Sequence, residues 1–148
     1  MLSVALKRLD QGKLKLLSAA PIIDSRPLGP SQRTYANTAA VIRTKLDPAA
    51  LLERLQAIER HFGRRPGGQR WAARVLDLDI VLWSGGSWAS PGLIVPHLPF
   101  RERLFVLRPA TVLAPRWRDL VTGLTLRQLL TRLTQPRPLP IRAGWKGP

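Results

Sequence analysis

Two aspartates in one short apolar stretch are the residues of this chain best suited to chemistry. Asp77 and Asp79 alternate with apolar residues between positions 75 and 83, which predicts a strand that places both carboxylates on one face, roughly 7 Å apart. The 148-residue chain has only nine acidic residues, and two carboxylates side by side repel one another. A bound divalent cation would offset that repulsion. A solvated strand face carrying two ordinary acids is equally compatible with the spacing.

The segment before this strand combines glycine with positive charge. The loop over residues 63–74 contains Arg64, Arg70, Trp71 and Arg74. Glycines permit large backbone excursions and arginines supply charge, so such a loop could close over a triphosphate and exclude water. An ordinary surface loop has the same composition, and the sequence alone does not separate the two interpretations.

The remaining polar candidates are less specific. Gln56 and Glu59 lie three apart on the longest expected helix, which is typical of the polar edge of an amphipathic helix. His97 precedes Arg101 and Arg103 and could donate to a phosphate, although a lone loop histidine is more often structural. The sequence contains neither a phosphate-binding loop of the G-x-x-x-x-G-K-[ST] kind nor a G-x-G-x-x-G motif, so nucleotide binding would use another architecture.

Composition excludes several classes of chemistry. There is no cysteine, so disulfides, zinc–thiolate sites and cysteine nucleophiles are ruled out, which fits a reducing cytoplasm. No apolar run approaches the ~20 residues that span a membrane. The net charge of +15 predicts attraction to polyanions, and with five tryptophans it allows a basic nucleic-acid-binding module as an alternative. That alternative leaves the paired aspartates unexplained, since acids facing phosphates without a metal are repulsive.

Hydrophobic periodicity and turn residues predict an α+β fold with one domain over residues 1–134 and a proline-rich tail over 135–148. Asp47 and Pro48 provide an N-cap and a first helical residue. The expected elements are the end of a helix at 2–9, strands at 14–23, 35–46 and 75–83, a helix at 47–63, an extended piece at 93–95, a turn or short helix at 99–104, a brief strand at 105–107 and a last helix at 125–133.

A family resemblance rests on the motif Arg70-Trp71-x-x-Arg74-x-Leu76-Asp77-Leu78-Asp79-Ile80. It resembles the signature of the 6-hydroxymethyl-7,8-dihydropterin pyrophosphokinases of folate biosynthesis. The supporting matches cover about residues 5–133 in collinear order: Pro27-Leu28-Gly29-Pro30, Tyr35-x-Asn37, Leu55-Gln56-x-Ile58-Glu59 with Gly63-Arg64, Pro96-His97, and Arg103-x-Phe105-Val106-Leu107.

The resemblance implies a ferredoxin-like αβα sandwich with an antiparallel sheet, and transfer of pyrophosphate from ATP to the hydroxymethyl oxygen of the pterin, giving AMP. It implies that Asp77 and Asp79 hold two Mg²⁺ ions, with Arg64 and Arg74 as further catalytic residues. The pterin would be bound by Ser25, Leu28, Tyr35, Asn37, Trp71 and Phe105, with Tyr35 and Phe105 stacking on its two faces. ATP would be contacted by Gln56, Glu59, Arg64, Trp71, Arg74, Ile80, His97 and Arg103.

The implied partners are these two small molecules. We expect a cytoplasmic monomer that binds neither a membrane nor a specific nucleic acid.

The chain departs from the family pattern at two places. The family opens with an interior strand and a Gly-Ser-Asn turn, whereas this sequence starts inside the helix that follows. We therefore expect the first strand to be missing here and the true start to lie upstream. A catalytically impaired, truncated relative is the alternative. The second departure is Pro66, where a further arginine is common and where neighbouring Arg65 is the candidate to compensate.

Overall fold

The computed structural model describes residues 2–25, 35–63 and 76–135. Its helices are α1 (Leu2–Arg8), α2 (Pro48–Gly63), α3 (Leu104–Leu113) and α4 (Leu126–Thr134), with the 3-10 helix η1 (Leu98–Glu102) directly before α3. Its strands are β1 (Leu14–Ala19), β2 (Ile23–Ser25), β3 (Tyr35–Asn37), β4 (Ala40–Thr44), β5 (Trp88–Ser90) and β6 (Leu93–Val95). The predicted mixed α+β class is confirmed.

The strands form antiparallel pairs, β1 with β4, β2 with β3 and β5 with β6. The two long strands expected at 14–23 and 35–46 are each divided into two. Pro21 lies at the first break, where its ring nitrogen has no hydrogen to donate to a ladder. The Ala20 amide donates to the Ala39 carbonyl at 2.9 Å, and the Thr38 hydroxyl donates to the Ala20 carbonyl at 2.7 Å. These bonds connect the two strand pairs across the break.

The predicted helix at 47–63 is confirmed as α2, and its start follows from local chemistry. The Asp47 carboxylate accepts a hydrogen bond from the Ala50 amide at 2.8 Å, which satisfies one of the unpaired amides of the first turn. Leu51, Leu55 and Ile58 are buried at helical spacing, so this face of α2 faces the core.

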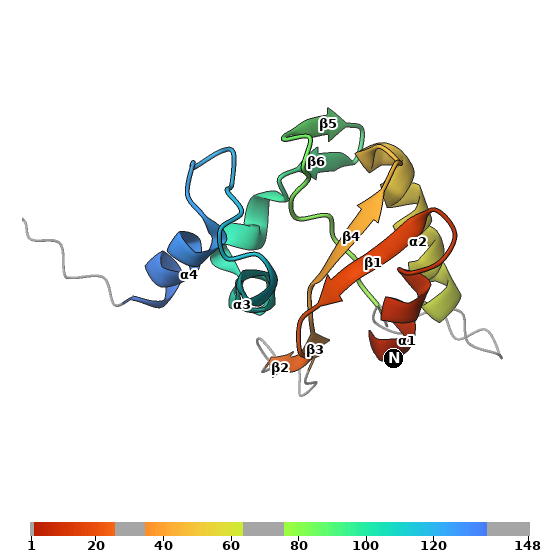
Figure 1. The fold of residues 1–148 in the computed structure, drawn as a ribbon, viewed down its shortest axis with the longest axis horizontal. Coiled ribbons are helices and arrows are strands. Elements are labelled where there is room, and N and C mark those ends of the chain that lie inside the picture. Colours follow the sequence, from red (N-terminus) through yellow and green to blue (C-terminus); the bar gives the residue numbers. More distant parts are fainter. Residues whose placement is uncertain (1, 26–34, 64–75, 136–148) are drawn as a thin grey trace, which may run out of the picture.

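The core is divided into two clusters, with helices α1 and α2 on one side of the β1–β4 pair and α3 and α4 on the other side of the molecule (Figure 1). The first cluster joins α1, β1 and α2 to Leu76, with Leu78 and Ile80 packed against it. The second joins η1, α3 and α4 through Phe100, Leu107, Ala114, Leu126 and Leu129. Val81 and Leu82 pack against the second cluster, so the segment carrying the paired aspartates runs from one cluster to the other.

Two expected strands are wrong. Residues 76–82 have no strand assignment; the Val81 carbonyl accepts a hydrogen bond from the His97 amide, and a side chain instead of a neighbouring strand bonds the Leu78 amide. Residues 105–107 belong to α3. The run Phe105-Val106-Leu107 has strand propensity, but α3 packs against α4 and thereby buries Leu107 completely, and such tertiary burial overrides a weak local preference.

The other expected elements match. The extended piece at 93–95 is β6, the turn or short helix at 99–104 overlaps η1, and the last helix is α4. Within the described residues no helix is long and apolar enough to cross a membrane. The ferredoxin-like arrangement, the additional upstream strand and the separation of the tail at 135–148 stay predictions.

Candidate active site

A cavity of about 310 Å³ lies between the two core clusters. Its lining is mostly apolar and includes residues from α1, α2, α3, β4 and the segment at 77–82. Five of the residues singled out from the sequence meet in this lining: Asn37, Asp77, Asp79, Ile80 and Phe105. A mostly apolar cavity with a few converging polar groups is the usual form of a small-molecule site.

The segment that carries the aspartates has the predicted alternation of faces without the predicted strand pairing. Leu76 is buried, Leu78 and Ile80 are half-buried, and Asp77 and Asp79 are exposed. Two exposed carboxylates that share a face fit Mg²⁺ bound together with substrate phosphates, because Mg²⁺ typically takes one or two carboxylates and completes its shell with phosphate oxygens and water. Among the described residues no group of three or more acidic, histidine or cysteine side chains could hold a metal by itself.

Glu59 fixes the position of this segment. Its carboxylate accepts a hydrogen bond from the Leu78 amide at 2.6 Å, and Leu78 stands between the two aspartates in the chain. Glu59 therefore joins α2 to the backbone that presents both carboxylates. The sequence places Gln56 beside Glu59, but Gln56 lines a separate shallow depression on the α2 surface with Glu53, Arg54 and Arg60 among other residues.

His97 lies beside Asp79 although the two residues are 18 positions apart in the sequence. Its Nε2 is 4.0 Å from Asp79 Oδ1, and the side chains of His97 and Asp79 are 23% and 40% exposed. The His97 amide donates to the Val81 carbonyl at 3.1 Å. Nδ1 of His97 is buried without a hydrogen-bond partner among the described residues. The imidazole is thus held next to the Asp79 carboxylate, and its Nδ1 can still take a hydrogen-bond partner.

Arg103 and Phe105 are neighbours at the start of α3. The Arg103 guanidinium carbon is 5.8 Å from the centre of the Phe105 ring, within the range of a cation–π contact. Arg103 is exposed and Phe105 is half-buried, so a cation lies over an aromatic ring that lines the cavity.

Six predicted site residues are described in part or not at all. Leu28, Arg64, Trp71 and Arg74 lie outside the described residues. Ser25 and Tyr35 are described by their backbones, which pair with one another across β2 and β3. Asn37, two residues after Tyr35 on β3, lines the cavity.

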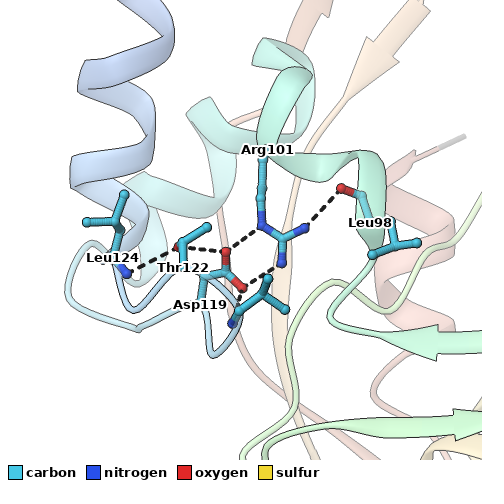
Figure 2. Close-up of polar contacts among 6 residues, drawn as sticks. Leu98, Arg101, Asp119, Thr122 and Leu124 are labelled. Carbon is cyan, nitrogen blue, oxygen red and sulfur yellow. Dashed lines mark hydrogen bonds and ion pairs between the residues drawn. The ribbon is translucent and has the colours of Figure 1, made fainter.

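Sequence reasoning missed the ion pair between Arg101 of η1 and Asp119 of the turn that precedes α4. Asp119 is completely buried, and its carboxylate accepts from both Nε and Nη2 of Arg101, the latter at 2.6 Å (Figure 2). Its other donors are the Val121 amide at 3.1 Å and the Thr122 hydroxyl at 2.8 Å. The sequence carries no signal for this pair, because Asp119 directly follows Arg118 and would be taken for an ordinary surface acid, and nothing in the sequence identifies Arg101 as its partner.

Burial by itself raises the pKa of Asp119, because it disfavours the charged form. Hydrogen bonds from Arg101, Thr122 and Val121, together with the positive charge of Arg101, outweigh burial and lower the pKa from 3.8 to about 2. The carboxyl is therefore held in its charged form by its partners.

This shift predicts a specific acid sensitivity. The unfolded chain binds a proton at Asp119 below about pH 4 whereas the folded chain does not until about pH 2, so this contribution to stability is complete above pH 4 and is lost as the pH falls toward 2. A shift of this size is worth about 2 kcal/mol. Urea unfolding of the wild type and of Asp119→Asn between pH 6 and pH 2 checks this prediction. The difference in free energy of unfolding between the two proteins should narrow as the pH falls, and a constant difference would contradict the lowered pKa of Asp119.

Comparison with known proteins identifies relatives over most of the chain. The family model of 7,8-dihydro-6-hydroxymethylpterin-pyrophosphokinase matches residues 1–115. The chain is 43% identical over 117 residues to 2-amino-4-hydroxy-6-hydroxymethyldihydropteridine pyrophosphokinase of Pseudomonas aeruginosa, which covers 78% of this chain and 71% of that protein. It is 38% identical over 136 residues to the enzyme of the same name from Haemophilus influenzae, covering 90% and 81%. For the Synechocystis enzyme of that name the identity is 36% over 120 residues, covering 81% of this chain and 61% of the relative.

Proposed function

This chain belongs to the 7,8-dihydro-6-hydroxymethylpterin-pyrophosphokinase family, and we propose that it transfers pyrophosphate from ATP to the hydroxymethyl oxygen of the dihydropterin, with AMP as the second product. The family is one of folate biosynthesis, and ATP and the pterin are the substrates that it implies. One observation in the structure carries the proposal for this chain. The cavity lining joins two exposed carboxylates, Asp77 and Asp79, to an aromatic ring and a carboxamide, Phe105 and Asn37.

The products define the bonds that change. The pterin hydroxymethyl oxygen attacks the β-phosphorus of ATP, the bond from that phosphorus to the oxygen bridging the α- and β-phosphates breaks, and AMP leaves with that oxygen. The hydroxyl proton is released. No covalent intermediate with the protein is needed, so catalysis consists mainly of positioning and electrostatic stabilisation.

The residues of the cavity divide between the two substrates in this proposal. Phe105 offers a face on which the pterin ring stacks, and the Asn37 carboxamide offers a donor and an acceptor to its edge. On the phosphate side, Arg103 adds positive charge and His97 can donate a hydrogen bond from its ring. Gln56, Ile80 and the residues outside the described ranges, Arg64, Trp71 and Arg74, stay proposed ATP contacts on the family pattern.

Asp77 and Asp79 would hold Mg²⁺, and their exposed carboxylates on one face fit that role. Two bound ions would neutralise charge on the attacking and leaving oxygens of an in-line displacement. Glu59 does not contact the ions in this proposal. Its bond to the Leu78 amide holds the backbone between the two aspartates and so keeps their carboxylates on the same side of the chain. We also propose that the protein works as a cytoplasmic monomer.

Product analysis tests the proposed reaction. The purified chain is incubated with ATP, Mg²⁺ and 6-hydroxymethyl-7,8-dihydropterin, and AMP and the pterin diphosphate are separated by chromatography. We expect the two products in equal amounts and none without the pterin. Absence of AMP from a folded protein would favour the catalytically impaired relative, whereas salt-dependent binding of generic DNA without AMP release would favour a nucleic-acid-binding module.

Phe105→Ala should weaken pterin binding specifically. Stacking of a heteroaromatic ring on an aromatic side chain is worth about 1–3 kcal/mol, so we expect the KM for the pterin to rise about 5- to 150-fold while the KM for ATP changes little. Steady-state kinetics with each substrate varied in turn measures both constants. Val112→Ala on the same helix is the matched control, because Val112 is 65% exposed. An unchanged KM for the pterin in Phe105→Ala would exclude stacking on this ring.

A further inference from the structure

Two of the proposed ATP contacts are the two ends of one short element. His97 is the N-terminal cap of η1 and Arg103 is its C-terminal cap. The Phe100 amide donates to the His97 carbonyl at 3.3 Å, and the Arg103 amide donates to the Phe100 carbonyl at 3.2 Å. Because these bonds close η1 on itself, His97 and Arg103 move as one unit, and whatever holds η1 determines the position of both.

Two adjacent residues hold η1 against the C-terminal part of the chain. The Phe100 ring is completely buried in the second core cluster. Arg101 forms the two-pronged bond to Asp119, and its Nη1 donates to the Leu98 carbonyl at 3.1 Å, within η1 itself (Figure 2). The guanidinium is thereby bonded both to η1 and to a carboxylate 18 residues away.

The carboxylate end of this connection is also fixed. The Asp119 amide donates to the Leu124 carbonyl at 2.8 Å, and the Gly123 amide donates to the Asp119 carbonyl at 2.7 Å. With the bonds from Val121 and Thr122 to the Asp119 carboxylate, these contacts close the turn at 119–124. The turn leads into α4, whose N-terminal cap Thr125 exchanges hydrogen bonds with Gln128. Arg101 is therefore bonded to a turn that is closed by its own hydrogen bonds.

The N-terminal end of η1 lies beside Asp79. The His97 amide bonds the Val81 carbonyl at 3.1 Å, and the His97 ring lies 4.0 Å from Asp79. A series of bonded groups thus runs from Asp119 through Arg101 and η1 to His97, and the His97 ring lies beside Asp79. We propose that Arg101 and Asp119 form a positioning pair that holds His97 beside Asp79 and Arg103 at the other end of η1 for binding ATP; this rests on the proposed function of the site.

The geometry explains why the pair should be an arginine and an aspartate. The bond uses two nitrogens of the planar guanidinium on two oxygens of one carboxylate while a third nitrogen holds Leu98. Lysine keeps the charge but has one nitrogen atom and cannot reproduce this fork. A pair that served stability alone would have no selective effect on one of the two substrates.

The test measures binding separately from turnover. The variants are Arg101→Lys, Asp119→Asn and the double variant, and Leu14→Ala is the control, since Leu14 is buried in the other core cluster and its truncation lowers stability without touching η1. Calorimetric titration with Mg²⁺ and α,β-methylene-ATP gives the Kd without reaction. In this analogue a methylene group replaces the oxygen that bridges the α- and β-phosphates, so the bond cannot be cleaved. All titrations are made at a temperature where circular dichroism shows each variant folded.

We expect the Kd for the analogue to rise at least about tenfold in each single variant. The Kd of the double variant should not exceed that of the single variant with the larger loss, since the two residues act as a unit. The Kd for the pterin should stay within about twofold, and Leu14→Ala should bind the analogue like the wild type. Unchanged affinity for the analogue in folded Arg101→Lys and Asp119→Asn would overturn the proposal, as would equal losses for both ligands. Should a single variant not fold, Thr122→Val, which removes one donor to Asp119 and leaves Arg101 in place, should give a smaller loss in the same direction.

The titration and the AMP assay together separate this inference from the proposed function. If the wild type binds the analogue but forms no AMP, the proposed reaction is wrong, while the comparison of variants still decides the role of the pair. If the wild type forms AMP and the variants bind the analogue normally, the reaction stands and the positioning pair is refuted.

Discussion

Replacing either Asp77 or Asp79 with alanine should lower the turnover of pterin and ATP by about 10²- to 10³-fold, which corresponds to about 3–4 kcal/mol of transition-state stabilisation. Each carboxylate is a proposed ligand for the ions that offset charge on the phosphates, and among the described residues the cavity lining holds no third carboxylate that could replace one of them. The measurement is AMP formation at saturating ATP, pterin and Mg²⁺.

Both aspartates are exposed, so the same substitutions should leave the protein folded, with thermal unfolding within a few degrees of the wild type. Glu53→Ala is the matched control because Glu53 is also an exposed carboxylate, lies on α2 and lines the separate depression. It makes the same change in net charge and should keep full turnover. Substantial turnover in Asp77→Ala or Asp79→Ala would refute the metal assignment.

Phe100→Ala should lower the free energy of unfolding by about 3–5 kcal/mol, more than any other substitution proposed for this protein. The ring is completely buried where η1, α3 and α4 meet, so truncation leaves a cavity that rigid neighbours on three helices cannot fill. Urea unfolding followed by circular dichroism should show a lower midpoint with an unchanged slope, since the surface exposed on unfolding is nearly the same.

Leu98→Ala is the control for this substitution because Leu98 belongs to the same short helix but is 57% exposed. Its loss should stay within about 0.5 kcal/mol. Phe100→Leu, which keeps most of the apolar volume, should fall between the two. A loss under about 1 kcal/mol for Phe100→Ala would mean that the second cluster is loosely packed and cannot hold η1 in place.

The elements predicted correctly are those with strong local signals. Asp47 and Pro48 define the start of α2, and buried leucines at helical spacing define its core face. At α4 the Thr125 hydroxyl and the Gln128 side chain satisfy one another's backbone amides, which is a short-range signal. These interactions involve residues three or four apart, so the sequence displays both partners together.

The wrong expectations were those that depended on distant partners. Alternation at 76–80 correctly predicted that Leu76, Leu78 and Ile80 are more buried than Asp77 and Asp79, because that depends on an extended backbone alone. It fails at the next two positions, where Val81 and Leu82 both pack against the second core cluster. Strand pairing requires a second chain segment at the right distance, and here the Leu78 amide bonds the Glu59 side chain. Residues 105–107 have strand propensity, yet their packing against α4 stabilises a helix.

The sequence by itself determined the family motif, the charged residue types and the common face of Asp77 and Asp79, because these depend on residue identity and on the two-residue period of an extended chain. Only the tertiary structure decided that His97 lies against Asp79 and that Arg101 is bonded to Asp119. Each of these contacts joins residues separated by 18 positions, so it depends on how the chain turns through η1 and around the second core cluster. No periodicity encodes such a path; it results from burying Phe100 and Leu107 together.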